Sequence, residues 1–205
     1  MNNLLSVKIG IIIAFIQIAV QILFLYISMN GGFLNMYLNV LLSVFTFVAY
    51  SIVIYFLRAT LVYFDEKQSI VNAFSIYLGL NIALFLVSTA ISYLVKDYHL
   101  FSYIITLYYV IVFYIAVQSF RVSQSVIKSG FALFAVILLI VILGNQALPV
   151  VFNFFNVDHH LYGYLHLLSI LPPIGAIIIF NSVVGNSEKT LDNFGEKSLF
   201  KNDPF

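Results

Sequence analysis

Long runs without a charged residue constrain the fold of this chain more than any motif does. The first run extends from Lys8 to Arg58. Further runs lie between Lys67 and Lys96, between His99 and Arg121, between Lys128 and Asp158, and between His160 and Glu188. Only 8% of the residues are charged, against roughly a quarter in soluble domains, and the mean hydropathy is +1.06. The composition therefore predicts an integral membrane protein.

Each of these runs is long enough to cross a bilayer, because a spanning helix needs about 20 consecutive apolar residues. The first run is too long for one helix, and Asn30-Gly31-Gly32 divides it in two. The first helix is expected to be retained, since a signal peptide has a shorter apolar region of about 7–15 residues. The sequence predicts an all-α domain over 1–184 with six transmembrane helices, at about 9–29, 33–57, 70–95, 100–120, 130–155 and 161–184. Residues 185–205 are predicted to form a polar tail.

Lysine and arginine are unequally divided between the two ends of this predicted bundle. Cytoplasmic loops near helix ends carry the excess of positive charge. On one side lie Lys8, Arg58, Lys67, Arg121, Lys128, Lys189, Lys197 and Lys201, and on the other only Lys96. The distribution predicts that both termini, and with them the polar tail, are cytoplasmic.

No Asp, Glu, Lys or Arg lies inside a predicted span, which weighs against proton-coupled transport, ion pumping and voltage sensing. Amides are the polar groups at depth: Gln17, Gln21, Asn81, Asn145 and Gln146. Our preferred interpretation is that they hydrogen-bond across helices, for roughly 0.6–2 kcal/mol each. The alternative is a polar layer that binds a solute or an ion.

Two patterns predict how the helices pack. Ser75, Gly79 and Ala83 recur every four residues, and such a small-residue stripe lets another backbone approach; helix 9–29 or helix 130–155 is the expected neighbour. Pro172-Pro173 removes two backbone donors and predicts a kink near 168–172. Such a break can point half-helix ends at a solute, or it can be an ordinary kink that neighbouring helices stabilise.

Three of the four histidines lie within residues 157–166. Asp158 is predicted to cap the helix that follows it. Zinc takes three or four close ligands, and Asp97 and His99, on the same predicted side as Asp158, His159 and His160, could complete such a site. These side chains are interpreted as polar residues at the membrane interface, with a metal cluster as the alternative.

No catalytic motif is recognisable in the sequence, and there is no cysteine. The adjacent carboxylates Asp65-Glu66 are followed by Lys67 and are interpreted as a solvated charge cluster. No cluster of basic residues predicts a nucleic acid as partner. The sequence therefore predicts no catalytic residue, no metal ligand and no cofactor.

Residues 56–143 contain the polar turn FDEKQS and the segment YYVIVFYIAVQSFRVSQSVIKSGFALFAVILLIVIL. This pattern resembles the Yip (Ypt-interacting protein) family of small multi-span membrane proteins, which implies a membrane-organising protein that acts by binding partners. The stretch LLSILPPIGAIIIFNSVVGNSEKTLDNFGE resembles the end of a family of small, uncharacterised bacterial inner-membrane proteins. Together the two resemblances imply a bacterial cytoplasmic membrane.

Our hypothesis from the sequence is a non-enzymatic scaffold, or a subunit of a membrane assembly. Its partners would be the lipid bilayer and another protein or a second copy of the chain. The alternative is a small-solute channel or transporter that uses Gln17, Asn81 and Pro172-Pro173. A membrane metalloenzyme with an outer-face His/Asp site is the third hypothesis.

Overall fold

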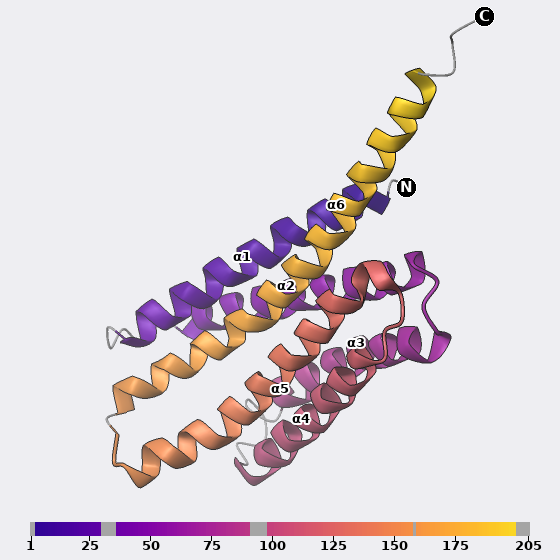
Figure 1. Cartoon of the computed structure of the whole chain (residues 1–205). Coiled ribbons are helices and arrows are strands. Elements are labelled where there is room, and N and C mark those ends of the chain that lie inside the picture. Colours follow the sequence, from indigo (N-terminus) through magenta and orange to yellow (C-terminus); the bar gives the residue numbers. More distant parts are fainter. Residues whose placement is uncertain (1–2, 30–35, 91–97, 158, 200–205) are drawn as a thin grey trace, which may run out of the picture.

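The computed structural model describes residues 3–29, 36–90, 98–157 and 159–199 (Figure 1). Within these residues every regular element is a helix. The elements are α1 (Asn3–Met29), α2 (Met36–Tyr63), α3 (Gln68–Ala90), α4 (Tyr98–Phe120), α5 (Ser125–Phe154), the 3₁₀ helix η2 (His159–Ile170) and α6 (Leu171–Leu199).

Six helical segments of the described chain are long and apolar enough to cross a membrane. They are Val7–Ile27, Val40–Tyr63, Gln68–Ala90, Tyr103–Phe120, Ser125–Phe154 and Tyr164–Asn186. The prediction of an all-α chain with six helices of spanning length is therefore confirmed.

The six α-helices form a closed ring. Each packs against the next along the chain, and α6 packs against both α5 and α1. The start of α1 and the connections 64–67 and 121–124 lie at one end, which we call the base of the ring, and the opposite end is the far end (Figure 1). η2 lies at the far end and contacts α1 and α5.

Apolar side chains fill the half of the ring near the base. The largest of those that are fully buried are Phe74 and Tyr77 of α3, Phe131 and Phe134 of α5, and Phe180 of α6. The rings of Phe74 and Phe131 meet edge to face, with centroids 5.8 Å apart, an arrangement that aromatic pairs favour. Side chains of α3 thus reach α5 across the interior.

Small residues let the helices that flank α6 approach it closely. A Cβ atom on Gly10 of α1 would lie 3.0 Å from Phe180 Cε2 of α6. A Cβ atom on Gly175 of α6 would lie 2.8 Å from Phe134 Cδ2 of α5. A Cβ atom at either position would force its neighbour to shift, so glycine permits the observed spacing of α1, α6 and α5.

The predicted role of the small-residue stripe on α3 is wrong. Gly79 and Ala83 are exposed, and a Cβ atom on Gly79 would meet no atom within 4 Å. The neighbours of α3 are α2 and α4, not α1 or α5. The interior is wide beside α3, so its inward face carries large residues such as Phe74 and Tyr77, and the small ones face outward.

The predicted irregularity near 168–172 lies where η2 ends and α6 begins. The 3₁₀ conformation extends to Ile170, and Pro172 and Pro173 occupy the first turn of α6. Proline is tolerated there because the N–H groups of a first turn have no partner within the helix. The helix then continues past Gly185, where the composition turns polar, to Leu199.

Glu66 joins two connections at the base, and its interpretation as a solvated residue is wrong. Its side chain is only 5% exposed. Its Oε1 atom accepts hydrogen bonds from Ser123 N at 2.6 Å, Gln124 N at 2.6 Å and Ser123 Oγ at 3.0 Å. The carboxylate thus lies at the N-terminus of α5, where the helix dipole favours a negative charge. A left-handed backbone at Asp65, with φ of 52°, precedes it in this tight turn.

The hydrogen bonds of Glu66 also determine its protonation. Burial raises the pKa of the carboxyl, but the donors of Gln124, Ser123 and Lys67 outweigh burial, so the pKa lies below its ordinary value of 4.5. A group whose pKa is lower in the folded state stabilises the fold above its unfolded pKa, and this contribution is lost as the pH falls through the folded pKa.

We predict that Glu66→Gln lowers the free energy of unfolding by about 1–3 kcal/mol near pH 7, because the amide brings a donor to a site that offers only donors. Thermal unfolding against pH measures the effect. The gap between wild type and Glu66→Gln should close as the pH falls below 4.5. The matched control is Asp65→Asn, at an exposed neighbour, which should leave the midpoint unchanged; an equal loss in both variants would contradict the role of Glu66.

Candidate functional site

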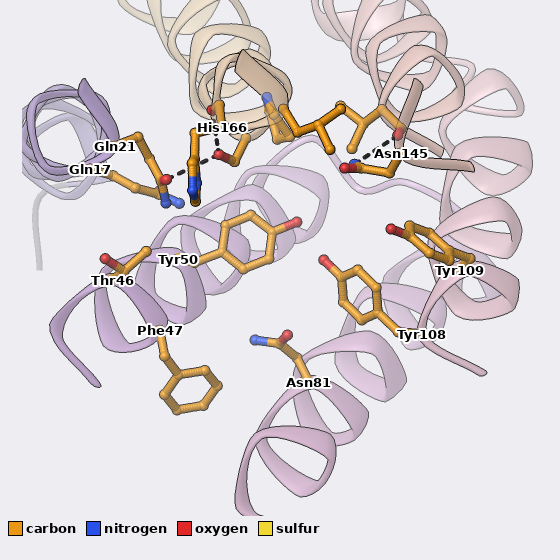
Figure 2. A pocket seen from close by; sticks show the side chains of 14 residues that line it. Gln17, Gln21, Thr46, Phe47, Tyr50, Asn81, Tyr108, Tyr109, Asn145 and His166 are labelled. Carbon is orange, nitrogen blue, oxygen red and sulfur yellow. Dashed lines mark hydrogen bonds between the residues drawn. The ribbon is translucent and has the colours of Figure 1, made fainter. Parts of the chain in front are cut away.

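A cavity of about 470 Å³ lies inside the ring, between the apolar core and the far end. Every α-helix and η2 contribute to its wall (Figure 2): Gln17, Gln21, Thr46, Phe47, Tyr50, Asn81, Tyr108, Tyr109, Val141, Asn145, Leu165, His166, Ser169 and Pro172. Its volume is within the range of about 300–1,000 Å³ that is typical of small-molecule sites.

The structure brings together four of the five amides that the sequence singled out. Gln17 and Gln21 lie one turn apart on the buried face of α1, and Asn81 lies on the inward face of α3. Asn145 reaches the same cavity from α5, whereas Gln146 is exposed. Pro172, from the predicted break, also lines the cavity.

The predicted hydrogen bonds across helices are confirmed for two of these amides. Ser169 Oγ of η2 lies 3.0 Å from Gln21 Oε1 of α1. It also lies 2.6 Å from the His166 carbonyl oxygen of η2, and the hydroxyl proton can be donated to either acceptor. Asn81 Nδ2 donates to Ser51 Oγ of α2 at 3.4 Å. Asn145 instead donates to a carbonyl of its own helix.

Gln17 and Thr46 line the cavity, and each carries a buried oxygen atom that no described residue satisfies. Gln17 is only 3% exposed, and both its Oε1 and Thr46 Oγ1 are buried without a hydrogen-bond partner among the described residues. The two residues come from neighbouring helices, α1 and α2, on one side of the cavity (Figure 2). An unpaired buried polar group costs about 1–3 kcal/mol, so a bound molecule that supplied the missing hydrogen bonds would stabilise the protein.

Aromatic residues form the floor and one wall. Tyr50, on the floor, shares a hydrogen bond of 2.7 Å with Tyr77, which is 1% exposed and belongs to the core beneath. Phe47 stacks on Phe85 with ring centroids 4.0 Å apart, and Tyr108 and Tyr109 of α4 lie on the opposite side of the cavity (Figure 2). The cavity therefore combines hydrogen-bonding groups with flat apolar faces, and buried aromatic side chains lie between it and the base.

The lining carries no full charge. Among the residues that line the cavity there is no Asp, Glu, Lys or Arg. His166 stacks on Phe24 with ring centroids 6.2 Å apart. Helix N-termini favour anions because their first backbone N–H groups are free to donate. At the N-terminus of α6, however, Pro172 and Pro173 have no N–H group to donate. The arrangement suits an uncharged molecule.

The sequence reasoning missed the hydroxyl and aromatic groups of the site. Thr46, Tyr50, Tyr108, Tyr109 and Ser169 were not among the candidates. Their position along the predicted spans could have identified them, because they lie at depths in the membrane similar to those of the amides.

The side chains of the predicted alternative, a metal cluster, lie outside the part of the chain that the structure describes. These are Asp97, His99, Asp158, His159 and His160. Where the structure is described, no three His, Asp or Glu side chains gather in a way that would hold a metal ion. The metal alternative stays a prediction.

Comparison of the chain with family models, with curated proteins and with solved structures finds no match. The resemblance to the Yip family therefore stays a prediction as well.

We predict that Gln17→Met leaves the thermal midpoint of the ligand-free protein unchanged or raises it, because no bond is lost and an unpaired acceptor is removed. The matched change Gln21→Met removes the contact with Ser169 and should cost roughly 0.6–2 kcal/mol. Thermal unfolding of both variants in detergent measures the difference. Equal destabilisation would show that Gln17 is a structural contact.

Proposed function

We propose that this chain is a multi-pass membrane protein that binds a small uncharged polar molecule in the cavity between its helices. The observation that carries the proposal is Gln17, which lines that cavity and whose buried Oε1 atom has no hydrogen-bond partner among the described residues. We further propose that the protein acts without catalysis, because binding alone accounts for the groups in the wall.

The proposed orientation places both termini in the cytoplasm. Lys8, Arg58, Lys67, Arg121 and Lys128 lie at the base or in the turns of helix next to it. Positive charge near helix ends favours the cytoplasmic side, so the cavity would lie in the outer half of the membrane. The bacterial cytoplasmic membrane is the setting that the sequence resemblances support.

The polar groups account for the kind of ligand. In a bundle surrounded by lipid, polar atoms must find partners inside it. Gln17 Oε1 needs a donor, and Thr46 Oγ1 can both donate and accept. A ligand with hydroxyl or amide groups meets both needs, and an ion would find no countercharge in the wall.

The filled core favours a binding site or a carrier over an open channel. Beneath the cavity, Tyr50 bonds to Tyr77, and Phe74 and Phe131 fill the space below. Tyr77, Phe74 and Phe131 are all buried. A carrier would have to separate these side chains before it could release a solute on that side.

We predict that a neutral compound raises the thermal midpoint of the purified protein. The test compares glycerol, glucose and uracil with charged counterparts of similar size, glycerol 3-phosphate, glucuronate and orotate. A ligand at 100 times its Kd stabilises by about 2.7 kcal/mol, a shift of roughly 5–10 °C at about 2–4 °C per kcal/mol.

Two variants separate binding from stability in this experiment. Asn81→Leu should abolish the ligand-induced shift, because Asn81 lines the cavity. The control Asn72→Leu makes the same change on the same helix at an exposed position and should keep the shift. If Asn81→Leu only lowers the starting midpoint and the shift persists, the amides are structural.

The Yip-like scaffold stays a second proposal, and one feature supports it. Gly79 and Ala83 are exposed on the outer face of α3, and small residues permit the close approach of a partner helix. The scaffold function is preferred if no compound shifts the midpoint and Gly79→Leu releases a chain that co-purifies with the wild-type protein.

A further inference from the structure

A second cavity, of about 270 Å³, adjoins the first between α2, α3 and α4. The two share four lining residues, Phe47, Asn81, Tyr108 and Tyr109. The remaining residues of the second cavity, which we call the side groove, are Leu84, Phe85, Ser88, Ile104 and Ile105. The two cavities therefore adjoin at these four residues, and the second lies between α3 and α4.

The side groove is apolar, and its rim faces outward. Of the five residues that belong to it alone, only Ser88 is polar, and the Ser88 hydroxyl is already bonded to the Phe85 carbonyl of its own helix. Ile105 of the groove is 37% exposed, and the adjacent Leu86 and Val87 of α3 are 62% and 47% exposed. From Asn81 to Ser88 the groove follows α3 for about 10 Å, at 1.5 Å per residue.

We infer that the ligand is an amphiphile, with a neutral hydrogen-bonding headgroup in the central cavity and a hydrocarbon chain in the side groove. The inference rests on the proposed function and adds the chemical class of the ligand. The headgroup would bond to Gln17 and Thr46, and the chain would leave the ring between α3 and α4 into the surrounding lipid.

The shape and polarity of the joined cavities support an amphiphile over a solute from water. A wholly polar molecule would leave the side groove without a matching surface, because apolar walls gain from apolar contact. A hydrocarbon alone would leave Gln17 Oε1 and Thr46 Oγ1 unpaired. A headgroup with a phosphate is disfavoured, since the wall offers no Lys or Arg.

The absence of tryptophan from the sequence makes the inference testable by fluorescence. Phe47→Trp places a single reporter where the two cavities join, and Tyr109→Trp places a second one on the opposite wall. Phe113→Trp is the control, since Phe113 of α4 is 54% exposed and lines neither cavity. Each variant is reconstituted in phosphatidylcholine vesicles.

Bromine on an acyl chain quenches a tryptophan that the chain contacts. We add dibromostearoyl glycerol, whose headgroup is neutral, at a low mole fraction. Its quenching should saturate at positions 47 and 109 and exceed that at position 113 by roughly twofold or more, because a bound chain raises the local concentration of bromine. Adding Asn81→Leu to the Phe47→Trp variant should remove this preference.

Other outcomes overturn the inference in distinguishable ways. Equal preference for dibromostearoyl lysophosphatidylglycerol would overturn the neutral headgroup. Quenching of both reporters by acrylamide, with bromolipid quenching no greater than at position 113, would overturn the amphiphile but keep a site for neutral solutes. If neither quencher reaches either reporter beyond the level of the control, the proposed function fails as well.

Discussion

A polar side chain in a membrane-spanning helix has no water to bind, so its hydrogen bonds must come from inside the bundle. Gln17, Tyr50 and Asn81 are therefore turned inward, and they fix which face of α1, α2 and α3 forms the interior. Every α-helix has an inward face, and the ring is closed because α6 packs against α1.

The two halves of the ring satisfy this constraint differently. Near the base, glycines such as Gly10 and Gly175 allow α6 to lie close to its neighbours, and aromatic rings fill the interior. Glu66, in the connection 64–67, accepts hydrogen bonds from the connection 121–124. Toward the far end the interior widens into the cavity. Gln17 Oε1 and Thr46 Oγ1 have no hydrogen-bond partner among the described residues there, and Ser119 Oγ has none near the base; only the first two belong to residues that line the cavity, and these two support a bound ligand.

Features that depend on local composition, such as the spans and the buried amides, could be predicted from the sequence. Features that depend on contacts between distant residues could not. The spans follow from runs without charge, and the amides were identified by their depth. The partners of Glu66 lie 57 and 58 residues away, so no local pattern could show its burial. The face of α3 was misjudged because small residues suit both a close contact and an outer surface, and only the width of the interior decides between them.

The central claim, that the polar residues line a polar cavity within the ring, is tested most directly by the reactivity of introduced cysteines. The chain has none of its own. Thr46 lines the cavity, whereas Val48 lies two residues away on α2 and is 45% exposed on the outer surface, so Thr46→Cys and Val48→Cys form the matched pair.

A neutral, membrane-permeant methanethiosulfonate reaches both positions. Only a thiolate reacts with it, and apolar surroundings suppress the ionisation of the cysteine thiol. The account predicts that Thr46→Cys reacts roughly tenfold faster or more; equal rates, or a faster reaction of Val48→Cys, would contradict it.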